Sequence, residues 1–305
     1  MAKRRRKNCV DLDGIVLLDK AQGVTSNQAL QQVKNLYRAC KAGHTGSLDP
    51  IATGLLPLCF GEATKISQFL LNADKRYWAR FQLGVETNTY DADGDVVADK
   101  PVDSNQRQVE RALNSFLGEI DQIPPMFSAV KQNGKALYKL AREGIEVERA
   151  PRRVNIFDIR ILGMENDQLE LEIHCSKGTY VRALAHDLGT QLGCGAHMSA
   201  LRRLQVGELD ISRAVTLVQL QAATPETRQA WIRPIDEALV NLPDVMLTEL
   251  ATHYLLQGQP VSVQHGHPPG WVRLYEPDQG FIGMGEVLDD GRVAPKRIMR
   301  NLRKA

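Results

Sequence analysis

Residues 43–54 read GHTGSLDPIATG. The glycines and the proline of this stretch restrict its backbone conformation, and the elements around it have to pack against that conformation. Its glycines permit backbone angles that other residues avoid, and Pro50 fixes its own φ and favours an extended conformation for Asp49. The stretch is therefore a loop with a tightly specified backbone, the kind of place where proteins hold reactive groups. Asp49 is its single carboxylate. An Asp can also cap a helical turn, but the long Gly- and Thr-rich setting favours a reactive role.

The composition is that of an ordinary soluble globular protein, with 43% hydrophobic and 24% charged residues in a chain of 305. This length gives room for about two domains and a substantial core. The net charge of +2 says little about partners, but basic residues cluster at 3–7 and 296–304, where they either attract phosphate or remain solvated. We expect no signal peptide and no membrane span, since no apolar run approaches the roughly 20 residues that a span requires.

The cysteines predict a reducing compartment. There are five of them, an odd count without a C-x-x-C pair, which favours free thiols in the cytosol over a disulfide framework. We therefore expect a cytoplasmic protein. The sequence has no Walker A loop, no complete G-x-G-x-x-G and no zinc-deaminase signature, and His265 and His267 have no partner cysteines. We expect no metal and no cofactor.

Hydrophobic patterns predict strands on both sides of the loop. Residues 14–18 are continuously apolar and predict a buried strand, whereas 77–83 and 169–175 alternate between apolar and polar side chains. The acidic segment 86–103 resembles a calcium loop in its spacing of aspartates, but Val96 occupies the place of the required glycine. We predict an acidic surface loop or hairpin there.

Helices and turns complete the pattern. Ser26 can cap one helix, and Thr179 can cap a second one over 181–192. After a chain break at Asn241-Leu242-Pro243, short β-like runs alternate with turns as far as the C-terminus. The sequence therefore predicts an α+β fold with a small β-rich unit at its end.

Two motifs resemble those of the TruB family of pseudouridine synthases. They are GHTGSLDPIATG at 43–54 and the strand-to-helix junction KGTYVR at 177–182. A third stretch at 124–138, PPMFSAVKQNGKALY, also resembles a family motif and leads, in that family, into a mobile loop that closes over the RNA. The resemblance extends from about residue 12 to the end of the chain.

The resemblance implies a two-part architecture. Residues 1–244 would form the pseudouridine synthase catalytic domain, with a mixed sheet and flanking helices. Residues 245–305 would form a small β-barrel that is similar to the PUA domain and binds RNA.

The resemblance also implies roles for individual residues. Asp49 corresponds to the catalytic carboxylate, and Arg182 to the arginine that forms an ion pair with it. The pocket for a flipped-out base would be formed by His44, Tyr77, Tyr180 and Leu201.

Lys20 is a supporting residue in a turn where the family has a proline and this chain has Ala21. This departure concerns the rigidity of the turn and not the chemistry, because Lys20 and Gly23 are both present.

The implied reaction is the isomerisation of uridine 55 in the T loop of tRNA to pseudouridine, without a metal or a cofactor. An unperturbed Asp, with a pKa of about 3.9, is ionised at neutral pH and can act as nucleophile or base. The sequence leaves open whether Asp49 attacks the sugar, attacks the ring or removes a sugar proton. The target base has to leave the folded RNA and be recognised by stacking and edge hydrogen bonds.

The expected partner is the T stem-loop of tRNA, bound by a monomer. Basic residues that suit RNA phosphates, or alternatively a solvated helix, are Lys131, Lys135, Lys139, Arg142, Arg149, Arg152 and Arg153. The sequence leaves two other functions open. A guide-RNA-dependent catalytic subunit like dyskerin is disfavoured by the short chain, and a non-catalytic tRNA chaperone would refold tRNA without changing uridine.

Overall fold

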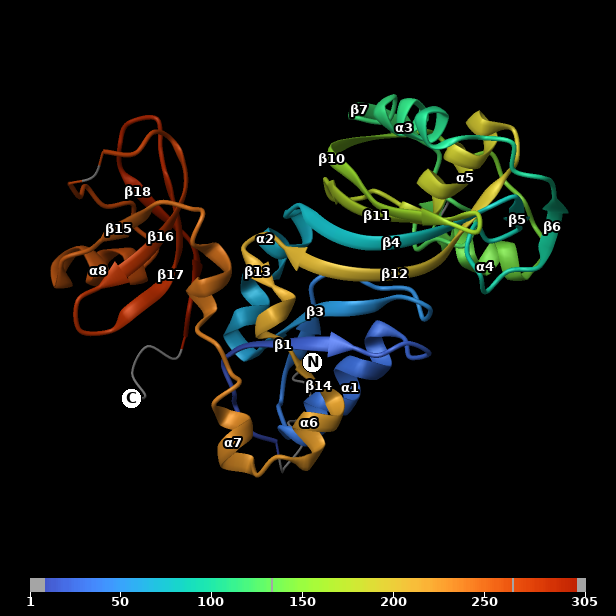
Figure 1. Cartoon of the computed structure of the whole chain (residues 1–305). Coiled ribbons are helices and arrows are strands. Elements are labelled where there is room, and N and C mark those ends of the chain that lie inside the picture. Colours follow the sequence, from blue (N-terminus) through green and yellow to red (C-terminus); the bar gives the residue numbers. More distant parts are fainter. Residues whose placement is uncertain (1–8, 133, 265, 301–305) are drawn as a thin grey trace.

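The computed structural model describes residues 9–132, 134–264 and 266–300, so the basic cluster at 3–7 lies outside the described residues. The chain forms a large mixed sheet with helices on both faces and a smaller sheet at its C-terminal end (Figure 1). The strand order of the large sheet is β14-β1-β3-β12-β4-β11-β10-β7, with β2 paired to β3 and β13 paired to β12. Its strands are β1 (Gly14–Lys20), β2 (Ala42–His44), β3 (Thr53–Phe60), β4 (Lys75–Leu83), β7 (Gly118–Gln122), β10 (Arg152–Glu165), β11 (Gln168–Cys175), β12 (Ala196–Val206), β13 (Leu209–Asp210) and β14 (Val215–Thr216).

Helices connect these strands, together with two short hairpins. The α-helices are α1 (Ser26–Leu36), α2 (Ser67–Asn72), α3 (Gln106–Asn114), α4 (Leu137–Arg142), α5 (Val181–Leu192), α6 (Leu217–Ala222), α7 (Pro225–Gln229) and α8 (Glu249–Leu256). The 3-10 helices are η1 (Gly61–Lys65), η2 (Ile211–Arg213) and η3 (Ile235–Leu239), and the hairpins are β5 (Val85–Thr87) with β6 (Val96–Asp99) and β8 (Lys131–Gln132) with β9 (Lys135–Ala136). Within the described ranges, no helix is both long and apolar enough to cross a membrane.

The strand β1 is buried on both faces, which explains its continuous apolar sequence. Ile15 and Leu17 belong to a core cluster that includes residues of α2, whereas Val16 and Leu18 belong to a cluster that includes residues of α1 and α6. The buried strand expected at 14–18 is therefore confirmed.

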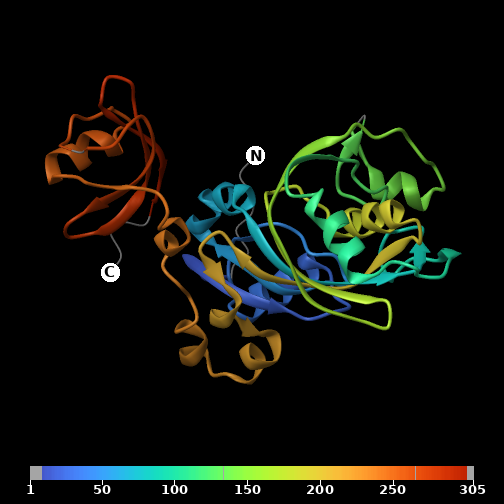
Figure 2. The same cartoon turned by 45° about the horizontal axis from the view of Figure 1, so that its top comes forward.

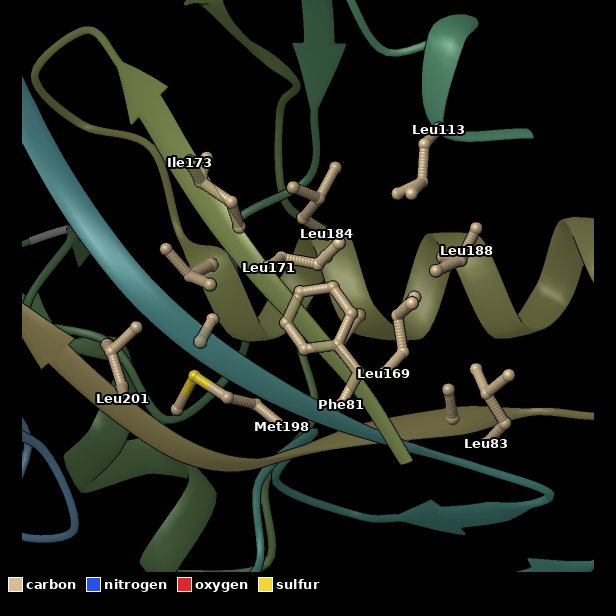
Figure 3. Packing of buried hydrophobic residues seen from close by; sticks show 14 of the residues in the cluster. Phe81, Leu83, Leu113, Leu169, Leu171, Ile173, Leu184, Leu188, Met198 and Leu201 are labelled. Atoms are coloured by element: carbon tan, nitrogen blue, oxygen red, sulfur yellow. The ribbon is translucent and has the colours of Figure 1, made fainter. Parts of the chain in front are cut away.

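A second core lies between the other half of the sheet and the helices α3 and α5. The alternating side chains of β4 and β11 place Phe81 and Leu169 on the same face, where they meet Leu184 and Leu188 of α5 (Figure 3). Burying a Leu or Phe side chain contributes about 1.5–3 kcal/mol. This packing fixes α5 against the sheet and so determines where its first turn lies.

The C-terminal unit is a four-stranded sheet in the order β15-β16-β17-β18. Its strands are β15 (Asp244–Met246), β16 (Gly270–Glu276), β17 (Gly280–Val287) and β18 (Val293–Ile298). It lies at one end of the molecule (Figures 1 and 2). Among the described residues, β15 and β18 are its two edges, so the expected barrel is found as an open sheet.

Contacts join this sheet to the η1–α2 segment of the large unit. Met284 and Met299 belong to the core cluster that contains Ile66, and Trp271 packs edge-on against Phe69 with ring centroids 5.0 Å apart. Both units therefore share buried surface.

The prediction that all the cysteines are free is wrong for one pair. Cys9 and Cys40 form a disulfide, while Cys59, Cys175 and Cys194 are free and buried. An isolated β-bridge between the two residues next to them, Val10 and Ala39, brings the two cysteines together across 31 residues of sequence. Cysteine count and spacing do not reveal such a contact.

Candidate active site

Arg203 secures both ends of the loop that joins β2 to β3. This β12 side chain is 1% exposed, and its Nη2 donates to the carbonyl of Gly46 (3.2 Å) while its Nε donates to the carbonyl of Leu55 (2.7 Å). Gly54 has a φ of +100°, and a Cβ at this position would lie 2.4 Å from the carbonyl oxygen of Arg203. Only glycine permits this approach, and the backbone around Asp49 is consequently fixed.

Ser26 holds the middle of the same loop. Its hydroxyl accepts from the N–H of Leu48 (2.7 Å) and donates to the carbonyl of Leu48 (3.1 Å). The expectation that Ser26 caps α1 is wrong, because Thr25 is the N-cap and forms a capping box with Gln28. The sequence offers two adjacent hydroxyl residues, and the buried one is used to fix the residue that precedes Asp49.

The guanidinium of Arg182 lies between two carboxylates. Its Nη2 is 2.9 Å from Oδ2 of Asp49, and its Nη1 is 3.1 Å from Oδ2 of Asp91. The side chains of Arg182 and Asp91 are 6% and 4% exposed, whereas that of Asp49 is 39% exposed. Arg182 is thus a buried support, and Asp49 is the member of the three that remains accessible.

Asp91 lies in the connection between β5 and β6, and both of its carboxylate oxygens accept hydrogen bonds. Its Oδ1 accepts from the hydroxyl of Thr89 (2.6 Å) and from the N–H of Asp93 (3.2 Å), and the Thr87 hydroxyl donates to its carbonyl (2.7 Å). The hairpin expected in this acidic segment is present, but Asp91 does not face the surface as expected. Hydrogen bonds to a charged group of this kind stabilise it in a buried position.

Tyr180 is the residue directly before α5, and hydrogen bonds to its backbone hold it in place. Its N–H donates to Oε1 of Gln122 (2.8 Å), and its carbonyl accepts from Nε2 of Gln122 (3.1 Å). The expectation that Thr179 caps α5 is wrong, because the Thr179 hydroxyl donates to the carbonyl of Ser176 instead. The side chain of Tyr180 is half-buried and forms no hydrogen bond among the described residues.

Tyr77 and Leu201 come from neighbouring strands. In the antiparallel pair of β4 and β12, Tyr77 is opposite Arg203 and Leu201 is opposite Ala79. Tyr77 packs against the core cluster that contains Leu201 and Leu48. Burial raises the pKa of Tyr77, and the Arg203 guanidinium opposes this rise. The two residues therefore lie on the side of the sheet that carries the loop between β2 and β3.

Lys20 and His44 approach the loop from β1 and β2. Lys20 is 1% exposed and donates to the carbonyls of Ala21 (2.9 Å) and Val24 (2.8 Å), which holds the turn that lacks the family proline. Burial lowers the pKa of Lys20 to about 8, although Asp49 raises it and Arg203 lowers it further. Burial, followed by Arg203, lowers the pKa of His44, which favours its neutral form.

The pKa of Asp49 is raised above the ordinary carboxyl value. Removal from water is the largest cause, and the charges of Asp91 and Asp93 act in the same direction. Arg182 is the main opposing influence, and Lys20 adds a smaller one. Desolvation of the carboxylate thus outweighs the adjacent arginine in setting the direction of the shift.

Two supporting residues were missed in the sequence. Asp91 is one of several acids in its segment, and nothing in their spacing distinguishes it from the others. Arg203 could have been placed from the period of a strand, because it shares a face of β12 with Leu201.

The sequence matches three family models in succession. Residues 34–181 match the TruB family pseudouridylate synthase N-terminal domain. Residues 182–240 match the tRNA pseudouridylate synthase B C-terminal domain, and residues 243–299 match the pseudouridine synthase II TruB C-terminal model. These models span most of the chain.

Full-length relatives are similar throughout. The chain is 52% identical over 295 residues to tRNA pseudouridine synthase B of Stutzerimonas stutzeri, covering 95% of this chain and 97% of the relative. It is 50% identical over 307 residues to tRNA pseudouridine synthase B of Serratia proteamaculans, covering 97% and 98%.

Two solved structures share the fold. One is an H/ACA RNP bound to a substrate RNA containing 2′-deoxyuridine, with a TM-score of 0.72, 24% identity, and coverage of 95% of this chain and 86% of the other. The second is the archaeal box H/ACA sRNP Nop10-Cbf5 complex, with a TM-score of 0.72, 24% identity, and coverage of 97% and 89%. At this identity the likeness concerns the fold alone.

Proposed function

This chain belongs to the TruB family of pseudouridylate synthases, and from that membership we propose that it is a tRNA pseudouridine synthase that isomerises uridine 55 in the T loop. Relatives at about half identity over the whole chain bear the name tRNA pseudouridine synthase B, which supports tRNA as the substrate. The observation that carries the proposal is the 2.9 Å contact between the accessible Asp49 and the buried Arg182.

Asp49 is the proposed catalytic carboxylate. The reaction breaks the bond between C1′ of the ribose and N1 of the uracil, rotates the ring, and forms a bond between C1′ and C5. The proton on C5 is lost to solvent, and N1 gains a proton. Arg182 keeps one oxygen of Asp49 in place, which limits the directions from which the carboxylate can approach the sugar or the ring. Attack on the sugar, attack on the ring and removal of a sugar proton are all open to it.

His44, Tyr77, Tyr180 and Leu201 are the proposed pocket for the flipped-out base. Aromatic and apolar side chains provide stacking surfaces for an unstacked base, which is how single bases of RNA are commonly bound. The neutral form of His44, which burial favours, can donate from one ring nitrogen and accept at the other. A side chain that can both donate and accept could occupy the space that the flipped-out base leaves in the RNA and so hold the RNA in this conformation.

The RNA would approach over the β8–α4 segment. Exposed cations there without a carboxylate partner among the described residues are Lys131, Lys135, Lys139 and Arg142. Arg152, the first residue of β10, is likewise exposed and without such a partner among the described residues. Arg149 and Arg153 are less suitable than the sequence indicates, because Glu146 lies 3.4 Å from Arg149, and Glu119 and Asp121 lie 3.8 Å from Arg153.

The same proposal assigns residues 1–244 to catalysis and 245–305 to RNA binding. The change from one sheet to the next at β15 supports this division. The enzyme would act in the cytoplasm on the T stem-loop. It would act as a monomer.

The test is tritium release from tRNA transcripts labelled at C5 of uridine. We expect release from wild-type tRNA and none from a transcript in which the T-loop uridine is replaced by cytidine. Release from both transcripts would contradict the position, and release from neither would contradict the reaction.

The alternatives give different outcomes in the same assay. A tRNA chaperone would change the folding of the transcript without releasing tritium. A guide-dependent subunit would release tritium only when a guide RNA is added.

A further inference from the structure

The helix α5 contacts the hairpin that carries Asp91 at two successive turns. Arg182 in the first turn binds the Asp91 carboxylate, and His186 follows four residues later on the same face of the helix. His186 stacks on Tyr90, with ring centroids 3.9 Å apart and 13° between the ring planes. Its Nδ1 also lies 3.3 Å from Oε1 of Glu86 at the base of the hairpin.

Tyr90 directly precedes Asp91 and has an unfavourable backbone conformation. Its φ of +65° lies in the left-handed region that residues other than glycine rarely adopt. The carbonyl of Tyr90 accepts from the N–H of Met198 (3.0 Å), and the N–H of Ala92 donates to the carbonyl of Met198 (3.1 Å). The turn is thus fixed on β12 by its backbone and on α5 by the Tyr90 ring.

We infer that Tyr90 and His186 are positioning residues for the reaction, and this inference rests on the proposed function. Their stack holds the turn so that Asp91 stays on Arg182, and Arg182 in turn holds Asp49. Neither side chain contacts Asp49 among the described residues, so they act through this chain of contacts. Loosening the turn reduces the share of enzyme in which Asp49 is correctly directed, which lowers the rate after RNA is bound and not the affinity for RNA.

The first test replaces the ring of Tyr90. Tyr90→Leu leaves an apolar side chain at this position but removes the stack, whereas Tyr90→Phe keeps the ring. A stacked aromatic pair accounts for about a three- to tenfold effect. We expect the single-turnover rate at saturating tRNA to fall about three- to tenfold in Tyr90→Leu, with KM unchanged, and to be retained in Tyr90→Phe.

A matched control removes an aromatic–histidine contact elsewhere in the protein. Phe157 on β10 lies against His174, with centroids 4.9 Å apart, and is 45% exposed. Phe157→Leu should leave the single-turnover rate unchanged. A wild-type rate in Tyr90→Leu, a change confined to KM, or an equal loss in Tyr90→Phe would overturn the inference.

Removing the other half of the pair gives a second measurement if Tyr90→Leu folds poorly. His186→Gln should lower the rate to a similar extent, and the double variant Tyr90→Leu/His186→Gln should lose no more than either single variant. Independent, multiplicative losses would contradict a shared contact.

Hydrogen exchange separates this inference from the proposed function. The amide of Ala92 should exchange faster in Tyr90→Leu than in wild type, whether or not the protein makes pseudouridine. If wild type releases no tritium, the proposed function fails. If wild type is active but the Ala92 amide is equally protected in both proteins, the positioning role of Tyr90 fails.

Discussion

Nη2 of Arg182, in the first turn of α5, lies 2.9 Å from Oδ2 of Asp49, in the loop that joins β2 to β3. The other terminal nitrogen of Arg182 is bound to the buried Asp91, and this second contact fixes the guanidinium while its Nη2 contacts Asp49. A planar guanidinium with two fixed contacts restricts direction as well as charge. Asp49 is consequently both oriented and kept more acidic than burial alone would leave it.

Replacing Arg182 tests both effects. In Arg182→Met, much of the side-chain volume remains and the charge is lost. Because Arg182 lowers the pKa of Asp49, its removal raises that pKa, and the acid limb of the single-turnover rate should move to higher pH. The plateau rate should fall roughly a hundredfold, because the carboxylate loses its fixed direction. The measurement is the single-turnover rate against pH at saturating tRNA.

Arg182→Lys is the control that keeps the positive charge but removes the planar group with its two contacts. It should leave the acid limb nearer the wild-type position while still lowering the plateau, because an ammonium cannot make both contacts as a guanidinium does. If Arg182 only bound RNA phosphate, binding would weaken and the pH profile at saturation would not move in Arg182→Met.

Asp91→Asn should move the acid limb in the opposite direction. The charge of Asp91 raises the pKa of Asp49, so removing it lowers that pKa and shifts the limb to lower pH. The plateau should nevertheless fall, since Arg182 loses the contact that fixes it. The same pH series in single turnover measures both effects. An upward shift of the limb would show that Asp91 acts on Asp49 in another way.

Asp49→Asn should increase the stability of the protein at neutral pH. The folded-state pKa of Asp49 is raised, so its contribution to stability is complete below the unfolded carboxyl pKa and is lost as pH rises through the folded value. Asn does not ionise, so the Asp49→Asn variant does not lose stability in this way as the pH rises. The difference in unfolding free energy between variant and wild type should favour the variant at pH 7 and shrink toward zero as the pH falls to about 4. Urea unfolding at several pH values measures it, and a variant that is less stable at pH 7 would refute the sign.

The C-terminal sheet can be tested without removing it. Arg297 is exposed, and its side chain bonds to the backbone carbonyl of Lys296, so its charge is available to RNA. Arg297→Gln should weaken tRNA binding and reduce the slope of log affinity against log salt by about 1. Arg292 is already paired with Asp290 at 2.7 Å, and Arg292→Gln should change the slope little. Equal slopes in wild type and Arg297→Gln would count against this contact.

Local patterns in the sequence were sufficient for several elements. The apolar run at 14–18 predicted a buried strand, and the alternation at 77–83 and 169–175 predicted β4 and β11, because side-chain period follows directly from backbone geometry. The resemblance to a family supplied the pairing of Arg182 with Asp49, which no local pattern contains.

Contacts between distant segments could not be read from the sequence. The position of β12 between β3 and β4 depends on pairings such as Arg202 with Thr53, far apart in the chain. The burial of Asp91 and the disulfide between Cys9 and Cys40 depend on such contacts as well. In each case the stabilising contact is with a residue far away in the sequence, and sequence spacing does not identify that residue.

The central claim is that the carboxylate of Asp49 carries out the isomerisation. The most direct test is single-turnover pseudouridine formation by Asp49→Asn, measured as tritium release alongside the Kd for the same tRNA. Asn keeps the size and shape of the side chain and removes the charge and basicity. We predict that product formation is abolished while the Kd stays close to the wild-type value. Substantial product from a clean Asp49→Asn preparation would contradict the account.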